Sequence, residues 1–172
     1  MTAGHVPATE GHPLAAALPR IEIVRAVDGP AYRSVLEIRR RVFAEEQGIV
    51  ETQVLDPDDQ RSLVLLAVAV EPGPDGPTRT AVATGRVTLN FGTRGEALIA
   101  WVATLPEARG RGVATSLVRD LLRHADERRA PSVVLAAQQH AEGLYRRLGF
   151  VPVGESYKVR DIPHRWMVRQ RP

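Results

Sequence analysis

The segment from Val102 to Thr115 places the end of a strand-like stretch, a glycine-rich turn and the start of an amphipathic helix in immediate succession (VATLPEARGRGVAT). Gly110 and Gly112 allow the backbone to approach a ligand closely. The first N–H groups of a helix have no partner within the helix, and the helix dipole favours negative charge there. Together with the cationic side chains of Arg109 and Arg111, the segment predicts an anion site suited to a diphosphate.

Two common diphosphate motifs do not match this segment. A Walker P-loop requires Gly-x-x-x-x-Gly-Lys-Ser/Thr, and the sequence contains no such run. A dinucleotide fingerprint requires a third glycine where Thr115 stands, and no β-α-β order surrounds the turn. Two interpretations remain. The segment is either an anion site of another kind or a glycine-rich turn that binds no ligand.

Hydrophobic periodicity predicts the elements around this turn. A first strand at 20–27 is followed by a helix that starts at Asp28-Gly-Pro30 and ends at Gly48, with only Arg39 interrupting its apolar stripe. The acidic stretch 51–60 is predicted to be a loop. Further strands are predicted at 63–70, 81–89, 97–104, 132–137 and from residue 150 onward, and further helices at 112–129 and 141–148. The buried stripe of the helix at 112–129 is predicted to contain Val113, Leu117, Leu121, Leu122 and Ala125.

This order of elements indicates the fold class. Three consecutive strands joined by short loops form an antiparallel meander. Crossover helices between the other strands imply a mixed sheet with helices packed on its faces. We therefore predict an α/β (α+β) fold whose mixed, mostly antiparallel central sheet has about six to seven strands, with helices on both faces. Residues 20–172 are expected to form a single domain after a flexible N-terminal tail at 1–19.

Composition narrows the function classes. The sequence has no cysteine, which excludes a thiol nucleophile, a thiolate zinc site and a disulfide framework. No apolar run approaches the roughly 20 residues of a membrane span, and the first residues lack the basic region of a signal peptide. We therefore expect a cytoplasmic protein with no membrane partner. The net charge is only +3 and the arginines are interleaved with acids, so nucleic acid is not an expected partner either.

Two short motifs identify a family. The run 109–114 reads RGRGVA, and the run 144–150 reads LYRRLGF. The first resembles the Arg/Gln-x-x-Gly-x-Gly/Ala signature of the GNAT superfamily of acetyl-coenzyme A-dependent N-acetyltransferases, where it also follows a strand and opens a helix. The second is similar to the aromatic-Tyr-x-x-Leu-Gly-Phe signature of that superfamily, with Leu144 in place of the usual aromatic residue.

Three further runs resemble the ElaA-like branch of the superfamily: RVFAEEQG at 41–48, AQQH at 137–140 and IPHRWM at 162–167. With the two motifs above, the resemblance covers about residues 20–169. It implies the GNAT fold, acetyl-CoA as the cofactor and a primary amine as the acceptor. Many relatives dimerise, so a homodimer is expected. Trp101, Val50 and Ala108 depart from the common pattern and leave the acceptor pocket undefined.

The resemblance also implies roles for particular residues. The residues implied to bind the cofactor are Val102, Ala103, Thr104, Arg109, Gly110, Arg111, Gly112, Val113, Ala114, Thr115 and Tyr145. A bulge in the strand at 97–104 is implied to free a backbone N–H for the oxyanion. The tyrosine at the Tyr145 position often protonates the departing thiolate, since a phenol of pKa about 10 can give a proton to sulfur as charge develops. A tyrosine ring that only packs on the sheet is the alternative.

The amine acceptor arrives as an ammonium and must lose a proton before it attacks. Glu46 is one catalytic candidate, because the end of the first helix usually borders the acceptor site in this fold. His140 is another, because an imidazole changes charge near neutral pH. The other titratable candidates are Glu45, Glu51, Asp56, Asp58, Asp59 and His164. The acidic group at 56–59 is expected to cap a turn or to pair with arginine. No His/Asp/Glu set has the spacing of metal ligands, so no metal site is expected.

The predicted function is acetyl transfer to a primary amine by direct attack in a ternary complex. The missing cysteine and the absence of a Gly-x-Ser-x-Gly elbow agree with direct transfer. A GNAT-fold protein that binds acyl-CoA as a sensor without turnover is one alternative, and a protein interaction module that holds another anion is a second. The identity of the amine does not follow from the sequence.

Overall fold

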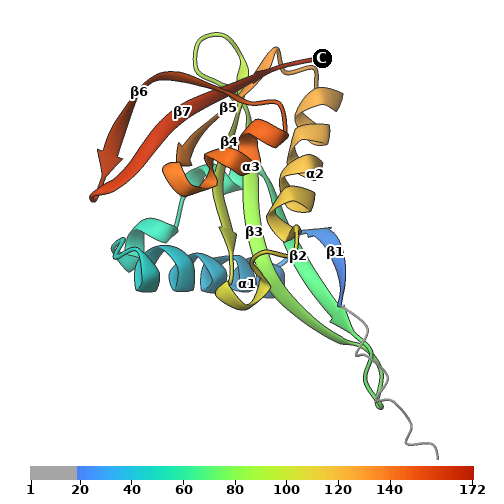
Figure 1. Cartoon of the computed structure of the whole chain (residues 1–172). Helices are drawn as coiled ribbons and strands as arrows, with labels where there is room; N and C mark the ends of the chain where they lie inside the picture. The colour runs from blue at the N-terminus through green and yellow to red at the C-terminus, as the bar shows by residue number, and fades with distance from the viewer. Residues whose placement is uncertain (1–18) are drawn as a thin grey trace, which may run out of the picture.

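The computed structural model describes residues 19–172, and residues 1–18 of the predicted tail lie outside the described residues. The described residues form a seven-stranded sheet with helices packed against it (Figure 1). The strands are β1 (Arg20–Arg25), β2 (Leu63–Glu71), β3 (Thr78–Phe91), β4 (Glu96–Thr104), β5 (Ser132–Gln138), β6 (Val151–Val159) and β7 (Ile162–Gln170).

The strand order is β1-β2-β3-β4-β5-β7-β6. Every neighbouring pair is antiparallel except β4 and β5, which are parallel. The parallel pair needs a crossover, and α2 provides it between the two strands. The predicted mixed, mostly antiparallel sheet and its β2-β3-β4 meander are therefore confirmed. The stretch predicted as strand from residue 150 onward forms the β6–β7 hairpin.

The helical elements lie on both faces of the sheet, as predicted (Figure 1). They are α1 (Gly29–Arg39), the π-helix η1 (Arg40–Glu46), α2 (Val113–Glu127), α3 (Glu142–Arg147), and the 3₁₀ turns η2 (Glu51–Val54), η3 (Pro57–Arg61), η4 (Pro106–Ala108) and η5 (Gln139–Ala141). Within residues 19–172, none of these helices combines the length and the apolar composition that a membrane span requires.

Each face of the sheet has its own apolar core. Strand β2 shows the division: Leu66 and Val68 pack with α1 and η1, whereas Leu65 and Ala67 pack with α2. A strand covered on both faces reads as a continuous apolar run, which is why residues 63–70 lack alternation. The α2 side of the sheet also includes Tyr145 of α3.

Helix α2 follows its predicted stripe. Leu117, Leu121 and Ala125 have no exposed surface. Burying each leucine side chain contributes roughly 1.5–3 kcal/mol to the free energy of unfolding. Gly112 caps the helix in the left-handed conformation, with φ of 76°. The helix therefore begins one residue after the predicted start and ends two residues before the predicted end.

The first helix begins as the sequence predicts. The Asp28 side chain accepts a hydrogen bond from the Ala31 N–H at 2.7 Å and caps the helix. After Arg39 the helix widens into the π-helix η1, which the periodicity did not reveal. Such wide turns occur frequently at functional sites. Gly48, with φ of 70°, follows η1 and ends the helix where the sequence placed its end.

The prediction of a loop at 51–60 missed the 3₁₀ turns η2 and η3, which occupy most of this segment. Asp56 accepts a hydrogen bond from the Asp58 N–H at 2.9 Å and Pro57 presets the next backbone angle, which together start η3. The turn holds Asp59 in the interior, where its carboxylate pairs with Arg39. The acidic stretch thus supplies the partner of the charge that interrupts the stripe of the first helix.

Candidate active site

The parallel strands β4 and β5 separate soon after they meet. Only two register pairs join them, Ala97 with Val133 and Leu98 with Val134. Beyond these pairs β4 stays with β3 and β5 stays with β7, so the sheet opens between them. The opening is the main part of a pocket of about 900 Å³, large enough for an extended cofactor arm and a small substrate.

A β-bulge in β4 lies at this opening. Arg86 of β3 pairs with Ala100, but Thr84 pairs with Ala103, so β4 holds one extra residue between the two pairs. Trp101, within the bulge, has φ of 56°, a left-handed conformation that is uncommon for a bulky residue. The bulge implied by the family resemblance is therefore present. It interrupts the ladder beside the pocket and leaves backbone groups there for a ligand.

Trp101 is held in place by three neighbours. Its indole Nε1 donates a hydrogen bond to Asp56 Oδ2 at 2.8 Å. The ring of Phe43 meets it edge-on, with 5.0 Å between centroids, and the Arg39 guanidinium lies 5.1 Å from the ring centroid. These contacts account for the strained backbone at the bulge, because the surrounding structure determines the position of the indole.

The Trp101 contacts belong to a buried charged cluster under the β4 side of the pocket. Arg39 donates to both oxygens of Asp59, at 2.6 and 2.9 Å, and Arg86 reaches Asp59 at 3.2 Å and Asp56 at 2.8 Å. Burial alone would raise the pKa of Asp59, but hydrogen bonds from Arg39 and Tyr32 and the nearby guanidinium charges outweigh it and lower the pKa. The expected pairing of the acidic group with arginine is confirmed.

The glycine-rich turn forms an open cradle at the start of α2. Gly110 and Gly112 have φ of 75° and 76°, and an added Cβ at either position would meet nothing within 4 Å. Among the described residues no side chain caps the N-terminus of α2, so its first N–H groups have no side-chain partner there. The cradle thus has the open backbone that the sequence predicted at this turn.

Most residues predicted to bind the cofactor line the pocket. Those that do are Val102, Ala103, Thr104, Arg109, Gly110, Gly112, Val113, Ala114, Thr115 and Tyr145. Arg111 is exposed and does not line the pocket. Thr104 adds a second sign of fit, because its buried Oγ1 has no hydrogen-bond partner among the described residues. A polar cofactor arm lying along β4 would satisfy that oxygen.

Arg109 and Glu46, which the sequence predicted for different roles, contact each other. The Arg109 Nη2 donates to both Glu46 oxygens at 2.9 Å, and its Nε donates to the Thr104 carbonyl at 2.9 Å. Both side chains remain about half or one-third exposed, at 47% and 35%. The pair closes the rim of the pocket between η1 and the cradle.

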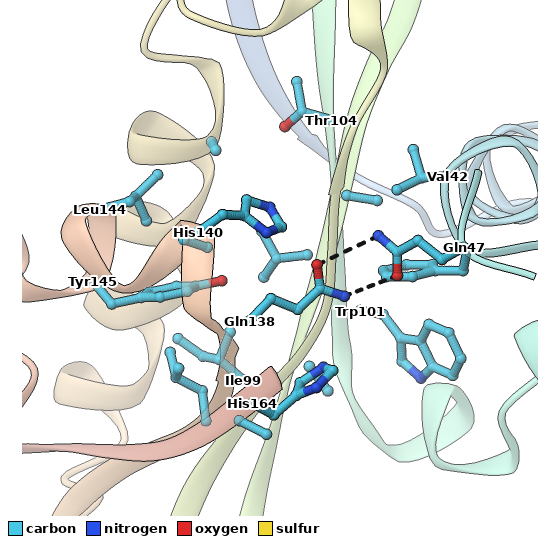
Figure 2. Close-up of a pocket in the computed structure, with 18 of the residues that line it drawn as sticks. Val42, Gln47, Ile99, Trp101, Thr104, Gln138, His140, Leu144, Tyr145 and His164 are labelled. Atoms are coloured by element: carbon cyan, nitrogen blue, oxygen red, sulfur yellow. Dashed lines mark hydrogen bonds between the residues drawn. The ribbon is translucent and has the colours of Figure 1, made fainter. Parts of the chain in front are cut away.

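Tyr145 lies on α3 with its ring packed edge-on against Phe150 at 5.9 Å. Figure 2 shows its hydroxyl directed into the pocket, on the same side as His140. Burial raises the pKa of the Tyr145 phenol to about 12. The hydroxyl therefore stays protonated across the physiological range and is available as a proton donor.

Two glutamine side chains cross the middle of the pocket (Figure 2). Gln138, at the end of β5, donates to Gln47 Oε1 at 2.8 Å, and Gln47 Nε2 lies 3.5 Å from Gln138 Oε1. In this view the pair lies between the side chains of Tyr145 and His140 and that of Trp101 (Figure 2).

His164 of β7 also points into the pocket (Figure 2). Its Nδ1 lies 2.8 Å from the Ile162 carbonyl, and a carbonyl only accepts, so Nδ1 carries the hydrogen. In the neutral ring Nε2 is then an acceptor. The same ring stacks on Tyr157, with 6.0 Å between centroids. The sequence had left His164 as a minor candidate.

Several pocket residues were missed at the level of sequence: Phe43, Tyr157, Val159, Arg160 and Trp166. They come from η1 and the β6–β7 hairpin, which meet only in the tertiary structure. Arg160, in the hairpin turn, donates to the Gly48 carbonyl at 2.8 Å and to Gln53 at 3.2 Å. The runs at 41–48 and 162–167, which resemble the ElaA-like branch, were the only sequence signal that these segments share a site.

A comparison with protein families gives a match over residues 32–150 to the acetyltransferase (GNAT) family. This match covers more than half of the chain. The protein belongs to the GNAT family. It is therefore an acyltransferase, and members of this family take the acyl group from an acyl-CoA donor. A search of curated proteins found no match to the chain.

Solved structures agree with this membership. ElaA from Escherichia coli superposes on this GNAT protein with a TM-score of 0.72 at 25% identity, covering 89% of this chain and 100% of ElaA. An acyl-CoA N-acyltransferase from Pseudomonas aeruginosa has a TM-score of 0.68 at 28% identity, covering 88% and 99%. The similarity to ElaA confirms the resemblance seen in the sequence.

A third solved structure was determined with coenzyme A bound. An aminoglycoside 6′-N-acetyltransferase complexed with coenzyme A has a TM-score of 0.65 at 15% identity, covering 88% of this chain and 96% of that chain. At this identity the likeness shows the shared fold.

Proposed function

We propose that this protein transfers the acetyl group of acetyl-CoA to a primary amine by direct attack in a ternary complex. One observation carries the proposal: a single pocket joins an open N–H cradle, an interrupted strand and a protonated phenol. Each of these serves one part of acyl transfer. The cradle suits a pyrophosphate, the strand offers N–H groups to a carbonyl oxygen, and the phenol offers a proton to a leaving thiolate.

The cofactor residues follow from the lining of the pocket. Gly110, Gly112 and the first N–H groups of α2 would hold the pyrophosphate. Val102 and the unpartnered Thr104 Oγ1 would hold the amide-bearing arm along β4. When bound, acetyl-CoA supplies a thioester that an amine can attack. A backbone N–H freed by the bulge then donates to the carbonyl oxygen, a contact that contributes about 3–4 kcal/mol in comparable enzymes.

We assign the proton transfers to two side chains in the pocket. Tyr145 donates a proton to the leaving sulfur, since its hydroxyl faces the pocket and remains protonated. His140 removes the proton from the amine, directly or through water, because its exposed ring has no hydrogen-bond partner among residues 19–172. Glu46 is bound to Arg109, so its proposed part is to hold that guanidinium at the rim.

Direct transfer is favoured by the side chains present. The hydroxyl side chains that line the pocket are those of Thr104, Thr115, Tyr145 and Tyr157. Among the described residues none of these hydroxyls is hydrogen-bonded to a histidine or carboxylate that would activate it as a nucleophile, and the chain has no cysteine. An acetylated enzyme intermediate therefore has no activated residue to form on.

The first experiment is a thermal titration with acetyl-CoA. At a hundred times its dissociation constant a ligand adds about 2.7 kcal/mol to the free energy of unfolding, which raises Tm by roughly 5–10 °C for a domain of this size. Gly112→Glu, which places a carboxylate in the cradle, should abolish the shift relative to its own unliganded Tm. No shift with acetyl-CoA or with coenzyme A would overturn the proposal.

Turnover then separates an enzyme from a sensor. Thiol release is measured with a panel of amines while the concentrations of acetyl-CoA and of the amine are both varied. Double-reciprocal plots of the initial rates should intersect, as expected for a ternary complex, and parallel lines in these plots would contradict direct transfer. His140→Gln should lower kcat/KM at neutral pH by about 100-fold or more, a typical loss for a general base. Binding without thiol release for any amine would instead support the acyl-CoA sensor.

A further inference from the structure

The part of the pocket formed by η1, the β4 bulge and the β6–β7 hairpin is here named the acceptor half. The inference drawn for this part rests on the proposed acetyltransferase activity. Figure 2 shows Trp101 and His164 within the acceptor half. The hairpin turn reaches the end of the first helix, where Arg160 donates to the Gly48 carbonyl at 2.8 Å. The lining residues are Phe43, Ile49, Trp101, Arg160, Ile162 and His164.

Among residues 19–172, the acceptor half has no free carboxylate. Glu46 is the only acidic residue of this described part that lines the pocket, and both its oxygens accept from Arg109 at 2.9 Å. Asp56, behind the wall, accepts from the Trp101 indole at 2.8 Å and pairs with Arg86 at 2.8 Å. A purely cationic amine would therefore enter without a counter-ion.

The charge that does face the acceptor half is positive. An arginine has five N–H groups, and Arg160 uses one on Gly48 and one on Gln53, which leaves three. No carboxylate pairs with Arg160 among residues 19–172. A guanidinium fork with free N–H groups is the side chain best suited to bind a carboxylate.

The remaining walls are apolar or aromatic. Trp101 is fixed by Asp56 and Phe43, and Tyr157 stacks on His164 at an interplanar angle of 26°. His164 presents Nε2, because its Nδ1 donates to the Ile162 carbonyl. A carboxylate accepting from Arg160 would place an apolar body against these walls and leave the amine directed past the Gln47–Gln138 pair towards His140.

We propose that the acceptor is a small primary amine that carries a carboxylate and an apolar or aromatic body, such as a free apolar amino acid, and that Arg160 determines this specificity. The carboxylate of such an acceptor supplies the negative charge that the acceptor half lacks among residues 19–172. Polyamines and other purely cationic acceptors are correspondingly poor substrates, since Arg160 repels them and no carboxylate attracts them.

The test compares acceptors that differ only in the carboxylate. Thiol release from acetyl-CoA is measured with L-phenylalanine, L-phenylalaninamide and 2-phenylethylamine. We expect kcat/KM for phenylalanine to exceed that for the other two by about 10-fold or more, as befits a charge-assisted bidentate contact. The amine of phenylalaninamide is less basic than that of phenylalanine and is more often unprotonated. Basicity alone would therefore favour the amide, which is the opposite of the expected result.

Variants of Arg160 identify the recognising group. Arg160→Gln should lower kcat/KM for phenylalanine by about 10–100-fold and change that for phenylalaninamide less than about 3-fold, and Arg160→Lys should recover part of the loss. Gln53→Ala removes one tether of Arg160 without altering charge and should preserve the preference for the carboxylate. An equal loss for both acceptors in Arg160→Gln would mean that Arg160 only ties the hairpin to the first helix, and would overturn the proposal.

Cofactor binding separates this inference from the proposed function. If acetyl-CoA raises Tm and spermidine or phenylethylamine is acetylated faster than phenylalanine, the inference is wrong and the acetyltransferase activity stands. If acetyl-CoA neither raises Tm nor releases thiol with any amine, the proposed function is wrong and the inference fails with it. Arg160→Gln should retain the wild-type Tm rise with acetyl-CoA, because Arg160 lies in the acceptor half.

Discussion

The Arg109 Nη2 lies 2.9 Å from both carboxylate oxygens of Glu46, joining two residues 63 positions apart at the rim of the pocket. The sequence predicted the guanidinium as a phosphate ligand and the carboxylate as a general base. In the folded protein each partly neutralises the other. The pair is exposed, so it contributes less than about 1 kcal/mol to the free energy of unfolding. Its effect should therefore be seen in binding.

Replacing Glu46 with glutamine should strengthen acetyl-CoA binding. The substitution frees the Arg109 guanidinium and removes a negative charge near a polyanionic ligand, so we expect Kd to fall by about 5-fold at low salt, with a smaller change at high salt. Calorimetric titration measures this change. Glu45→Gln, in the same π-helix but paired with Arg40, is the matched control. A kcat loss of about 100-fold with unchanged Kd would instead make Glu46 the general base.

Tyr145→Phe should preserve the fold and remove the proton donor. The ring keeps its edge-on contact with Phe150, and the pocket loses only the hydroxyl. We expect kcat to fall by about 100-fold with stability at pH 7 changed by less than about 1 kcal/mol. Steady-state kinetics and urea unfolding measure the two quantities. Wild-type turnover in the variant across the pH range would show that the tyrosine only packs against the sheet.

The same residue should make stability depend on alkaline pH. The pKa of Tyr145 is raised by burial to about 12, above the unfolded value of about 10, so its stabilising contribution is complete below pH 10 and is lost as pH rises towards 12. We expect the wild type to lose roughly 1–2 kcal/mol more than Tyr145→Phe over this window. Urea unfolding at pH 9, 10 and 11 measures the difference. Burial also raises the pKa of Tyr32 to about 12 and raises that of Tyr157, but both tyrosines are present in the two proteins, so their contributions cancel in the comparison.

Asp59→Asn should destabilise the fold strongly. It leaves Arg39 and Arg86 buried without their shared carboxylate, which costs about 3–5 kcal/mol at pH 7. Because the pKa of Asp59 is lowered, its stabilisation is present above the unfolded value of about 3.9 and is lost as pH falls through the lower folded value. The difference in unfolding free energy between wild type and variant should therefore begin to shrink below about pH 4 and vanish only below the folded-state pKa of Asp59. Asp58→Asn, in an exposed pair with Arg61, should change stability by less than about 1 kcal/mol.

Two glycine substitutions should act in opposite directions. Gly112 has φ of 76°, so alanine there should cost about 1–2 kcal/mol and reduce the Tm rise caused by coenzyme A. Gly143 lies in α3, where alanine should stabilise by up to about 1 kcal/mol and leave the Tm rise unchanged. Thermal unfolding with and without coenzyme A measures both effects. Equal destabilisation by the two variants would show that the cradle conformation is not the cause.

The amino-acid sequence alone determined most of the strands and helices and the open glycine-rich turn before α2. Gly110, Gly112 and the α2 stripe are neighbours along the chain, and local rules of helix capping and periodicity apply to them directly. The mixed sheet followed because the order of strands and helices restricts how they can pair. The left-handed glycines and the amphipathic helix were therefore predictable, whereas the π-helix η1 was not, since its wide turn is not encoded in apolar spacing.

Only the tertiary structure decided the acceptor half and the pairing of charges. Glu46 meets Arg109, Gln47 meets Gln138 and Arg160 meets Gly48 across 63, 91 and 112 positions, and no local rule relates such distant residues. The separation of β4 from β5 depends on which neighbour each strand keeps, a property of the whole sheet. Arg39 shows the difference most simply: its charge interrupts an apolar stripe in the sequence, and packing brings Asp59 to neutralise it.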